Sequence, residues 1–151
     1  MRKITMLLLA LTINAAALAP LYADGGYARG DSRLAPFQQL IDDENYQGAI
    51  EALEKALAES SDDADLLNLL AYSHRKSMRF VIALDYYQKA LQIDPEHRGA
   101  NEYLGELYLQ MDRLDLALER LKVLDKDCFF GCDEFDELEE AIETYRSQNS
   151  S

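Results

Sequence analysis

Three stretches of the chain align with one another at one constant offset, which places Asn45, Arg79 and Arg113 in equivalent positions. The aligned segments are residues 45–50, 79–84 and 113–118. The agreement continues further along each segment, with one set formed by Leu53, Tyr87 and Leu121 and another by Ala56, Ala90 and Leu124. A fixed period between about 20 and 50 residues indicates stacked supersecondary units, which build a surface for binding. The repeating positions hold no residues suited to catalysis.

Composition limits the classes of partner. Hydrophobic residues make up 48% of the 151, which is enough for the packed core of one domain. The formal net charge is −13, whereas nucleic acids and anionic membranes are bound through Lys/Arg patches. The excess of acid favours a basic partner or serves solubility alone, and the sequence does not choose between the two.

The first residues have the pattern of a secretory signal peptide. Met1, Arg2 and Lys3 form a basic start, residues 4–19 are nearly all apolar, and Ala23 precedes the first acid. We expect cleavage after Ala23, export to the periplasm and a soluble mature chain. The apolar run is shorter than the roughly 20 residues that span a bilayer, which disfavours an uncleaved anchor.

Apolar residues recur at helical spacing along the rest of the chain, and no segment alternates with the period of a strand. We expect a flexible lead-in over residues 24–35, then seven helices. Their expected ranges are 36–44, 46–59, 64–77, 79–93, 98–110, 113–124 and 133–145, followed by a frayed tail over 148–151. The fold class predicted is all-α.

These residues resemble the tetratricopeptide repeat family, whose unit is a pair of helices spanning about 34 residues. The middle unit (64–97) matches best, through Leu67, Leu70, Ala71, Ala83, Tyr87, Ala90 and Pro95. The third unit (98–131) carries Leu104, Gly105, Tyr108, Ala117 and Leu121, and the first (36–61) is the weakest. The resemblance implies an α-solenoid of three helix hairpins, like those of small exported bacterial proteins. Residues 132–147 would form a capping helix with an acidic outer side.

The resemblance also implies a concave groove lined by the first helix of each unit. By family position, the residues expected in it are Asn68, Tyr72, Arg75, Lys76, Glu102, Tyr103, Glu106 and Gln110. Glu102 and Glu106 would repel a C-terminal carboxylate, the ligand of the best-known site of this family. Arg75 and Lys76 beside Tyr72 form a basic spot suited to an interface, or they simply end a helix where cations suit the dipole.

Cys128 and Cys132 are the only cysteines. In an exported protein they favour a disulfide that joins the end of the sixth helix to the start of the seventh. A redox pair and a soft-metal site are the alternatives, although the spacing is not Cys-x-x-Cys and no third ligand is evident. Phe129 and Phe130, between the cysteines, are expected to dock against the core.

Three functions remain open at this point. The first is a non-catalytic adaptor that binds a protein or peptide partner in the groove, without a cofactor. The second is a structural or oligomeric component of an envelope assembly, and the third is a redox or metal-handling accessory centred on Cys128 and Cys132. The sequence shows no phosphate-binding loop and no grouping of nucleophile, base and acid, so we do not expect an enzyme.

Overall fold

The structure is a computed structural model in which residues 31–149 are described. These residues form seven α-helices and no strand. The helices are α1 (Ala35–Asp42), α2 (Tyr46–Glu59), α3 (Ala64–Lys76), α4 (Phe80–Ile93), α5 (Arg98–Gln110), α6 (Leu114–Asp127) and α7 (Asp133–Asn149). The expected signal peptide and most of the lead-in lie outside the described residues. Within them, no helix combines the length and apolar character needed to cross a membrane.

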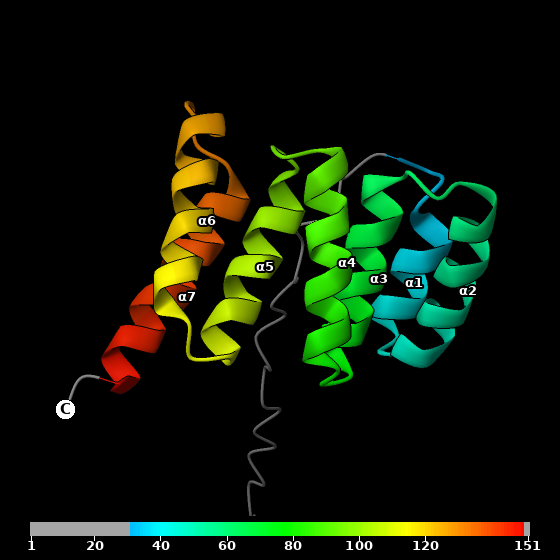
Figure 1. The fold of residues 1–151 in the computed structure, drawn as a ribbon, viewed down its shortest axis with the longest axis horizontal. Coiled ribbons are helices and arrows are strands. Elements are labelled where there is room, and N and C mark those ends of the chain that lie inside the picture. Colours follow the sequence, from blue (N-terminus) through cyan, green and yellow to red (C-terminus); the bar gives the residue numbers. More distant parts are fainter. Residues whose placement is uncertain (1–30, 150–151) are drawn as a thin grey trace, which may run out of the picture.

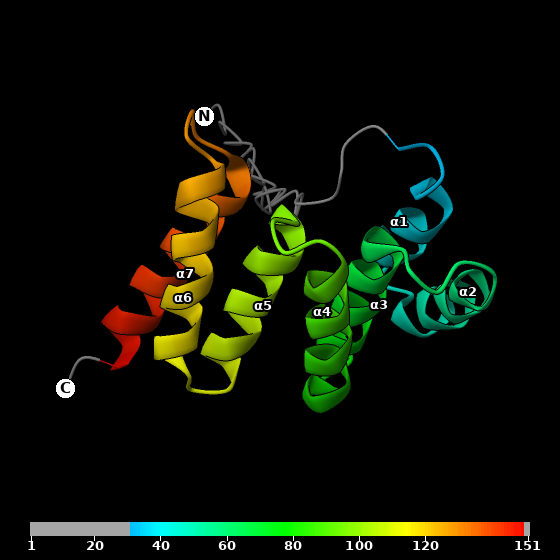
Figure 2. The ribbon, with the colours of Figure 1, turned by 45° about the horizontal axis from the view of Figure 1, so that its top comes forward.

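The helices pair in sequence and stack in a row (Figure 1). Contacts join α1 with α2, α3 with α4 and α5 with α6 as hairpins, and further contacts join α2 with α3 and α4 with α5. The last helix, α7, packs against both α5 and α6, and the turned view shows it beside α6 at the end of the row (Figure 2). The prediction of an all-α solenoid of helix hairpins with a final extra helix is confirmed.

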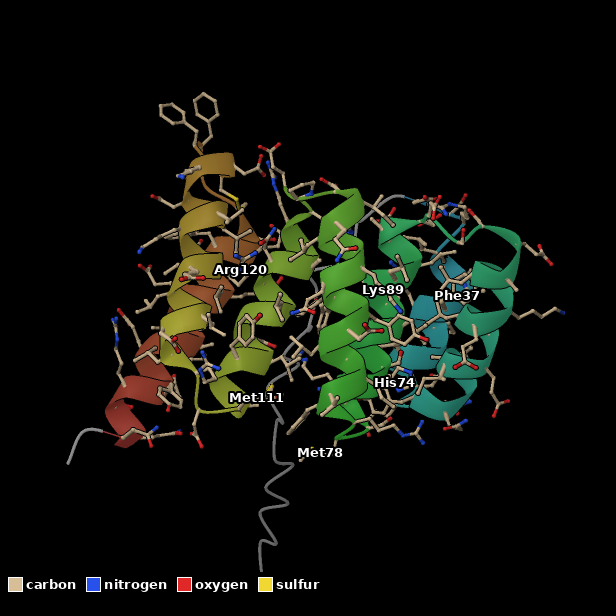
Figure 3. All side chains as sticks on the ribbon, in the orientation of Figure 1. Phe37, His74, Met78, Lys89, Met111 and Arg120 are labelled. Carbon is tan, nitrogen blue, oxygen red and sulfur yellow. A yellow bond between two sulfur atoms is a disulfide. The ribbon has the colours of Figure 1, made fainter. Side chains whose placement is uncertain are left out.

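The turn inside each hairpin repeats with the period of the sequence. Glu44, Met78 and Asp112 occupy equivalent positions in successive units and have positive φ values of 55°, 60° and 58°. Each follows a helix end closed by two backbone hydrogen bonds; after α3, the N–H of Met78 donates to Arg75 and that of Arg79 to His74. This is the Schellman arrangement, in which glycine is the usual left-handed residue. Figure 3 labels Met78 and Met111 at the same edge of the array, where these turns lie.

Side chains cap several helix starts. Asn45 accepts from the Gly48 N–H at 3.1 Å and Asp63 from the Leu66 N–H at 3.1 Å. Each bond satisfies one N–H group that has no partner within its helix. The His97 Nδ1 accepts from Ala100, so its Nε2 donates to Asp65 on α3 and ties the start of α5 to that of α3.

The ends of the array differ from the expected boundaries. Leu34 is only 2% exposed and packs in the core, so ordered structure begins within the expected flexible lead-in. At the other end, α6 continues to Asp127 and α7 to Asn149, which includes part of the expected tail. The α7 extension was not evident because its last residues are polar and face solvent.

Small residues let neighbouring helices approach. Ala83 and Ala117 are completely buried in the hairpins. A Cβ atom added to Gly105 would lie 2.6 Å from Leu138 Cδ2, so an alanine there would force the Leu138 side chain of α7 to shift. The close approach expected at Gly105 is confirmed, and its partner is the last helix.

Candidate functional site

A groove of about 1430 Å³ runs between α1, α3, α5 and α7. These are the helices that open successive units, and α7 adds a fourth to the series. Apolar and aromatic side chains lie next to acidic ones along its wall. Among the lining residues are Ile41, Tyr46, Tyr72, Leu109, Tyr145, Asp42, Glu106, Glu137 and Glu140. A concave surface with aromatic anchors has the character of an interface that receives a partner.

The structure divides the predicted groove residues into two groups. Those that line the groove are Tyr72, Arg75, Lys76, Glu106 and Gln110. Asn68, Glu102 and Tyr103 are not among the residues that line it, and each is at most 2% exposed. An inner helix of a solenoid is covered on both flanks by its neighbours, so only a narrow strip of it reaches the groove. The structure therefore does not place these three positions in the groove wall.

The contribution of α7 was missed. Its acidic side was expected to face away from the array as a cap, but Glu137 and Glu140 line the groove together with Tyr145. The sequence does contain an indication: Leu138 and Ile142 follow Leu104 and Tyr108 at the same offset as the other matches. The last helix thus takes the place of the first helix of a further unit.

Arg75 is held inside the groove wall. Its side chain is 5% exposed, and its Nη1 lies 2.6 Å from Glu106 Oε2. The guanidinium also lies 5.2 Å from the ring centre of Tyr72 and 5.4 Å from that of Tyr103. Burial acts to lower the pKa of Arg75, but Tyr87, Glu106 and Tyr72 outweigh it and raise the pKa. Arg75 is therefore a paired cation rather than the exposed basic spot that was expected.

Glu102 is buried beside other carboxyl groups rather than beside a group of opposite charge. It is 0% exposed and lies beside the carboxyl of Glu137. Burial, a side-chain hydrogen bond with Glu137 and the nearby carboxyls of Glu106, Glu137 and Glu134 together raise the pKa of Glu102 to about 10. The side chain is consequently neutral near pH 7.

A smaller hollow of about 420 Å³ lies away from the groove, between α2, α3 and α4. Leu57, Leu67 and Tyr86 line it, and His74 stacks on Tyr86 with ring centres 5.6 Å apart. Neither His74 nitrogen has a hydrogen-bond partner within residues 31–149, and burial lowers the pKa of His74. His74 and Lys89 are labelled in Figure 3. No group of three or more possible metal ligands occurs among residues 31–149.

Cys128 and Cys132 form the predicted disulfide, with their Cα atoms 5.5 Å apart. The bond closes the loop between α6 and α7. The expected docking of the intervening phenylalanines was wrong: Phe129 is 83% exposed and Phe130 is 98% exposed, with their rings edge to face at 5.1 Å. A loop this short, tied at both ends, cannot turn these side chains back onto the core.

The comparisons with known proteins agree with this architecture. A family model described as anaphase-promoting complex, cyclosome, subunit 3 matches residues 42–124, more than half of the 151 residues. The match begins at the last residue of α1 and ends within α6. No curated protein matches the chain.

Proposed function

The chain belongs to the family described as anaphase-promoting complex, cyclosome, subunit 3, which is built of tetratricopeptide-like repeats, and on this premise we propose that it is a protein–protein interaction module whose groove binds a partner. Repeats of this family are generally non-catalytic, and we assign the chain no reaction. The partner is a protein or a peptide segment laid along α1, α3, α5 and α7.

The groove itself carries this proposal. It offers about 1430 Å³, a space that suits an extended segment with several side chains. Tyr46 and Tyr145, both half-buried, lie along it as rings with polar ends, and tyrosine is enriched where interfaces concentrate their binding energy. The cation–π contacts of Arg75 and its bond to Glu106 fix the position of Tyr72 before any partner arrives.

We propose that the module acts in the periplasm. The basic start and apolar run before Ala23 support this location, as does a disulfide, a bond that persists in oxidising compartments. Fractionation of the native host, with mass spectrometry of the purified protein, tests it. A periplasmic product that begins at Asp24 is expected. A full-length product in the cytosolic fraction would overturn the proposal.

Site-specific photo-crosslinking tests groove binding. Benzoylphenylalanine placed at Gln110 or Gln148 reports on the groove, because both residues line it and are exposed. The same group at Gln88 or Lys122, exposed positions of α4 and α6 outside the groove, serves as the control. Groove binding predicts a crosslinked partner from the first pair and not from the second. The same products from both pairs, or products from the second pair alone, would contradict it.

The surroundings of Arg75 decide which groove variant is useful. Reversal of its charge would bury a second carboxyl beside Glu106, so the loss of a partner could reflect unfolding. Lys76→Glu with Gln110→Glu changes the groove at two positions outside the packed interior and leaves Arg75 in place. This double variant is the proper control for capture of the partner.

The exposed phenylalanines favour a second candidate function, a structural part of an envelope assembly. Phe129 and Phe130 project from the disulfide-closed loop, which is not part of the groove wall. Crosslinks from benzoylphenylalanine at Phe130, without any from Gln110, would favour this alternative over groove binding.

A further inference from the structure

The exposed apolar side chains of residues 31–149 concentrate on one helix. Large hydrophobic side chains are exposed in the loop between the two cysteines and on α4 with the turn before it. Those of α4 and its turn are Met78, Val81, Ile82 and Ile93. No residue of α4 lines the groove. The exposed face of α4 is therefore a surface separate from the groove.

The neighbouring units carry polar side chains at three of these positions. Met78, Val81 and Ile93 are apolar, whereas their equivalents one unit before and one unit after are polar or charged. These equivalents are Glu44 and Asp112, Gln47 and Asp115, and Glu59 and Asp127. Polar and charged residues are usual on a solvated helix face, and an exposed apolar patch marks an interaction surface. The middle unit thus differs from its neighbours where a partner could reach it.

The exposed face of α4 is also complementary to itself. Ile82, Asp85, Lys89 and Ile93 follow one another at helical spacing and so lie in one row. An apolar residue stands at each end of the row, and between them Lys89 Nζ lies 2.7 Å from Asp85 Oδ2. Since α4 carries no other charged residue, its net charge is zero in a chain whose net charge is −13.

A two-fold axis would turn this row into a matched pair. If two copies of α4 pack antiparallel, Ile82 lies beside the partner's Ile93 and Asp85 beside the partner's Lys89, at both ends of the contact. A parallel pair would instead bring like charges together, which is unfavourable. Figure 1 shows α4 near the middle of the row of helices, where a second copy can meet it squarely.

We propose that this face of α4 binds a second copy of the chain through an antiparallel contact between the two α4 helices. The self-complementary order of charges and apolar ends favours a second copy over an unrelated protein. The proposal does not depend on groove binding. Both grooves would stay open in the dimer, because α4 contributes nothing to their walls. If the grooves bind as proposed above, a dimer holds a bivalent partner by avidity.

Sedimentation velocity over a range of concentrations tests the contact, with each protein purified as the host processes it. One helix face is small beside a standard interface of about 1,600 Å², so we expect a dissociation constant in the micromolar range. Asp85→Lys should weaken the dimer at least about tenfold, because the new cation would face the partner's Lys89. Glu119→Lys makes the same change at the equivalent exposed position of α6 and should alter the dissociation constant less than about twofold. A monomer at every concentration, or equal weakening by both variants, would overturn the proposal.

Complementary charge reversal sharpens the test. Asp85 and Lys89 are both exposed, so changing either leaves the core intact. Lys89→Asp should also give monomers, because the new acid would face the partner's Asp85. Mixed in equal amounts, the Asp85→Lys and Lys89→Asp proteins should form a heterodimer, because the cations of one then face the acids of the other. A mixture that stays monomeric, although circular dichroism shows both proteins folded, would refute the assignment.

Cysteine crosslinking tests the orientation and the place of the contact. Ile82→Cys mixed with Ile93→Cys should form a disulfide-linked dimer under mild oxidation, whereas Ile82→Cys alone should not. Self-crosslinking of Ile82→Cys would mean a parallel contact and would overturn the proposal. So would dimers that persist in Asp85→Lys but are lost in Phe130→Ser or in the groove variant Lys76→Glu with Gln110→Glu, because they would place the contact elsewhere.

Discussion

Arg75 on α3 and Glu102 on α5 are buried ionisable side chains, one basic and one acidic, on helices that occupy equivalent places in successive units. Arg75 has a carboxylate at 2.6 Å and two aromatic rings around its guanidinium. Glu102 has the carboxyls of Glu137, Glu106 and Glu134 around it, which favour its neutral form. The α3 wall thus satisfies its charge within the chain. Glu102 on α5 instead avoids an unpaired buried charge by staying protonated near pH 7.

The largest effect should follow from breaking the compensated side. Glu106→Gln leaves Arg75 buried without its counter-charge, and we expect the free energy of unfolding to fall by about 3 kcal/mol. Arg75→Met should cost less, because an apolar side chain of similar length fills the space. Urea unfolding of both single variants and of the double variant measures the interaction free energy between Arg75 and Glu106. A double variant no more stable than Glu106→Gln alone would contradict this account of Arg75.

The next effect concerns Glu102 and depends on pH. The pKa of Glu102 is about 10 in the folded chain and near 4.5 when unfolded, so the folded state binds the extra proton between these values. Its contribution to stability is complete below about pH 4.5 and is lost as the pH rises toward 10. Glu102→Gln should remove this loss and flatten the decline of unfolding free energy with pH. Parallel curves for the two proteins would refute the assignment.

Opening the disulfide should loosen the α5–α7 wall rather than the α3 wall. The bond closes the short loop from Cys128 to Cys132, and its loss as Cys128→Ser should cost about 2 kcal/mol. Hydrogen exchange should accelerate in α7 and stay unchanged in α3. Faster exchange in α3 as well would mean that the two walls unfold as one unit.

A smaller effect on stability is expected at the contact between Gly105 of α5 and Leu138 of α7. Gly105→Ala places a methyl group against Leu138, and overpacking should outweigh the gain in helix propensity by about 1 kcal/mol. Leu138→Ala combined with Gly105→Ala should lower the free energy of unfolding by less than the sum of the two single variants, because the smaller side chain at position 138 makes room for the added methyl group. Gly105 of α5 and Ala71 of α3 occupy equivalent positions in successive units. Ala71→Gly is therefore the matched control. It should destabilise the protein, and Leu138→Ala should not reduce that cost.

The smallest expected effect is an increase in the free energy of unfolding. Met78 ends the α3 turn with a φ of 60°, which glycine adopts without steric cost. Met78→Gly should raise the free energy of unfolding by about 0.5–1 kcal/mol. Asp112→Gly, at the equivalent turn after α5, should gain less, since aspartate tolerates this backbone and Asp112 accepts a hydrogen bond from Tyr145. Thermal unfolding compares them, and an equal or greater gain at Asp112 would be the contrary result.

The repeat pattern predicted the helix pairs and much of the core because each repeating position has the same neighbours in every unit. Tyr87, Ala83 and Ala117 are completely buried, as their places in the pattern require. Inside the array, the predicted helix ends lay close to the observed ones, and the largest difference was at the end of α6. The fold could be predicted where the residues of one unit repeat at equivalent positions in the next.

The candidate site could be predicted only partly, because it depends on how units pack rather than on their own pattern. Glu102 and Tyr103 look exposed in a single unit, but neighbouring helices cover them. Glu137 and Glu140 look solvent-facing until the angle of α7 turns them into the groove. Phe129 and Phe130 are apolar, which predicts burial, whereas a short closed loop gives them no path to the core.

The closed loop between α6 and α7 has a further consequence for any contact made through Phe129 and Phe130. The bond between Cys128 and Cys132 removes backbone freedom before a partner arrives, so less conformational entropy is lost when the two rings become ordered. Chemical reduction would therefore slow or weaken such a contact without removing a single side chain from it. The loop's oxidation state sets how well its two rings are preorganised, independently of what the groove holds.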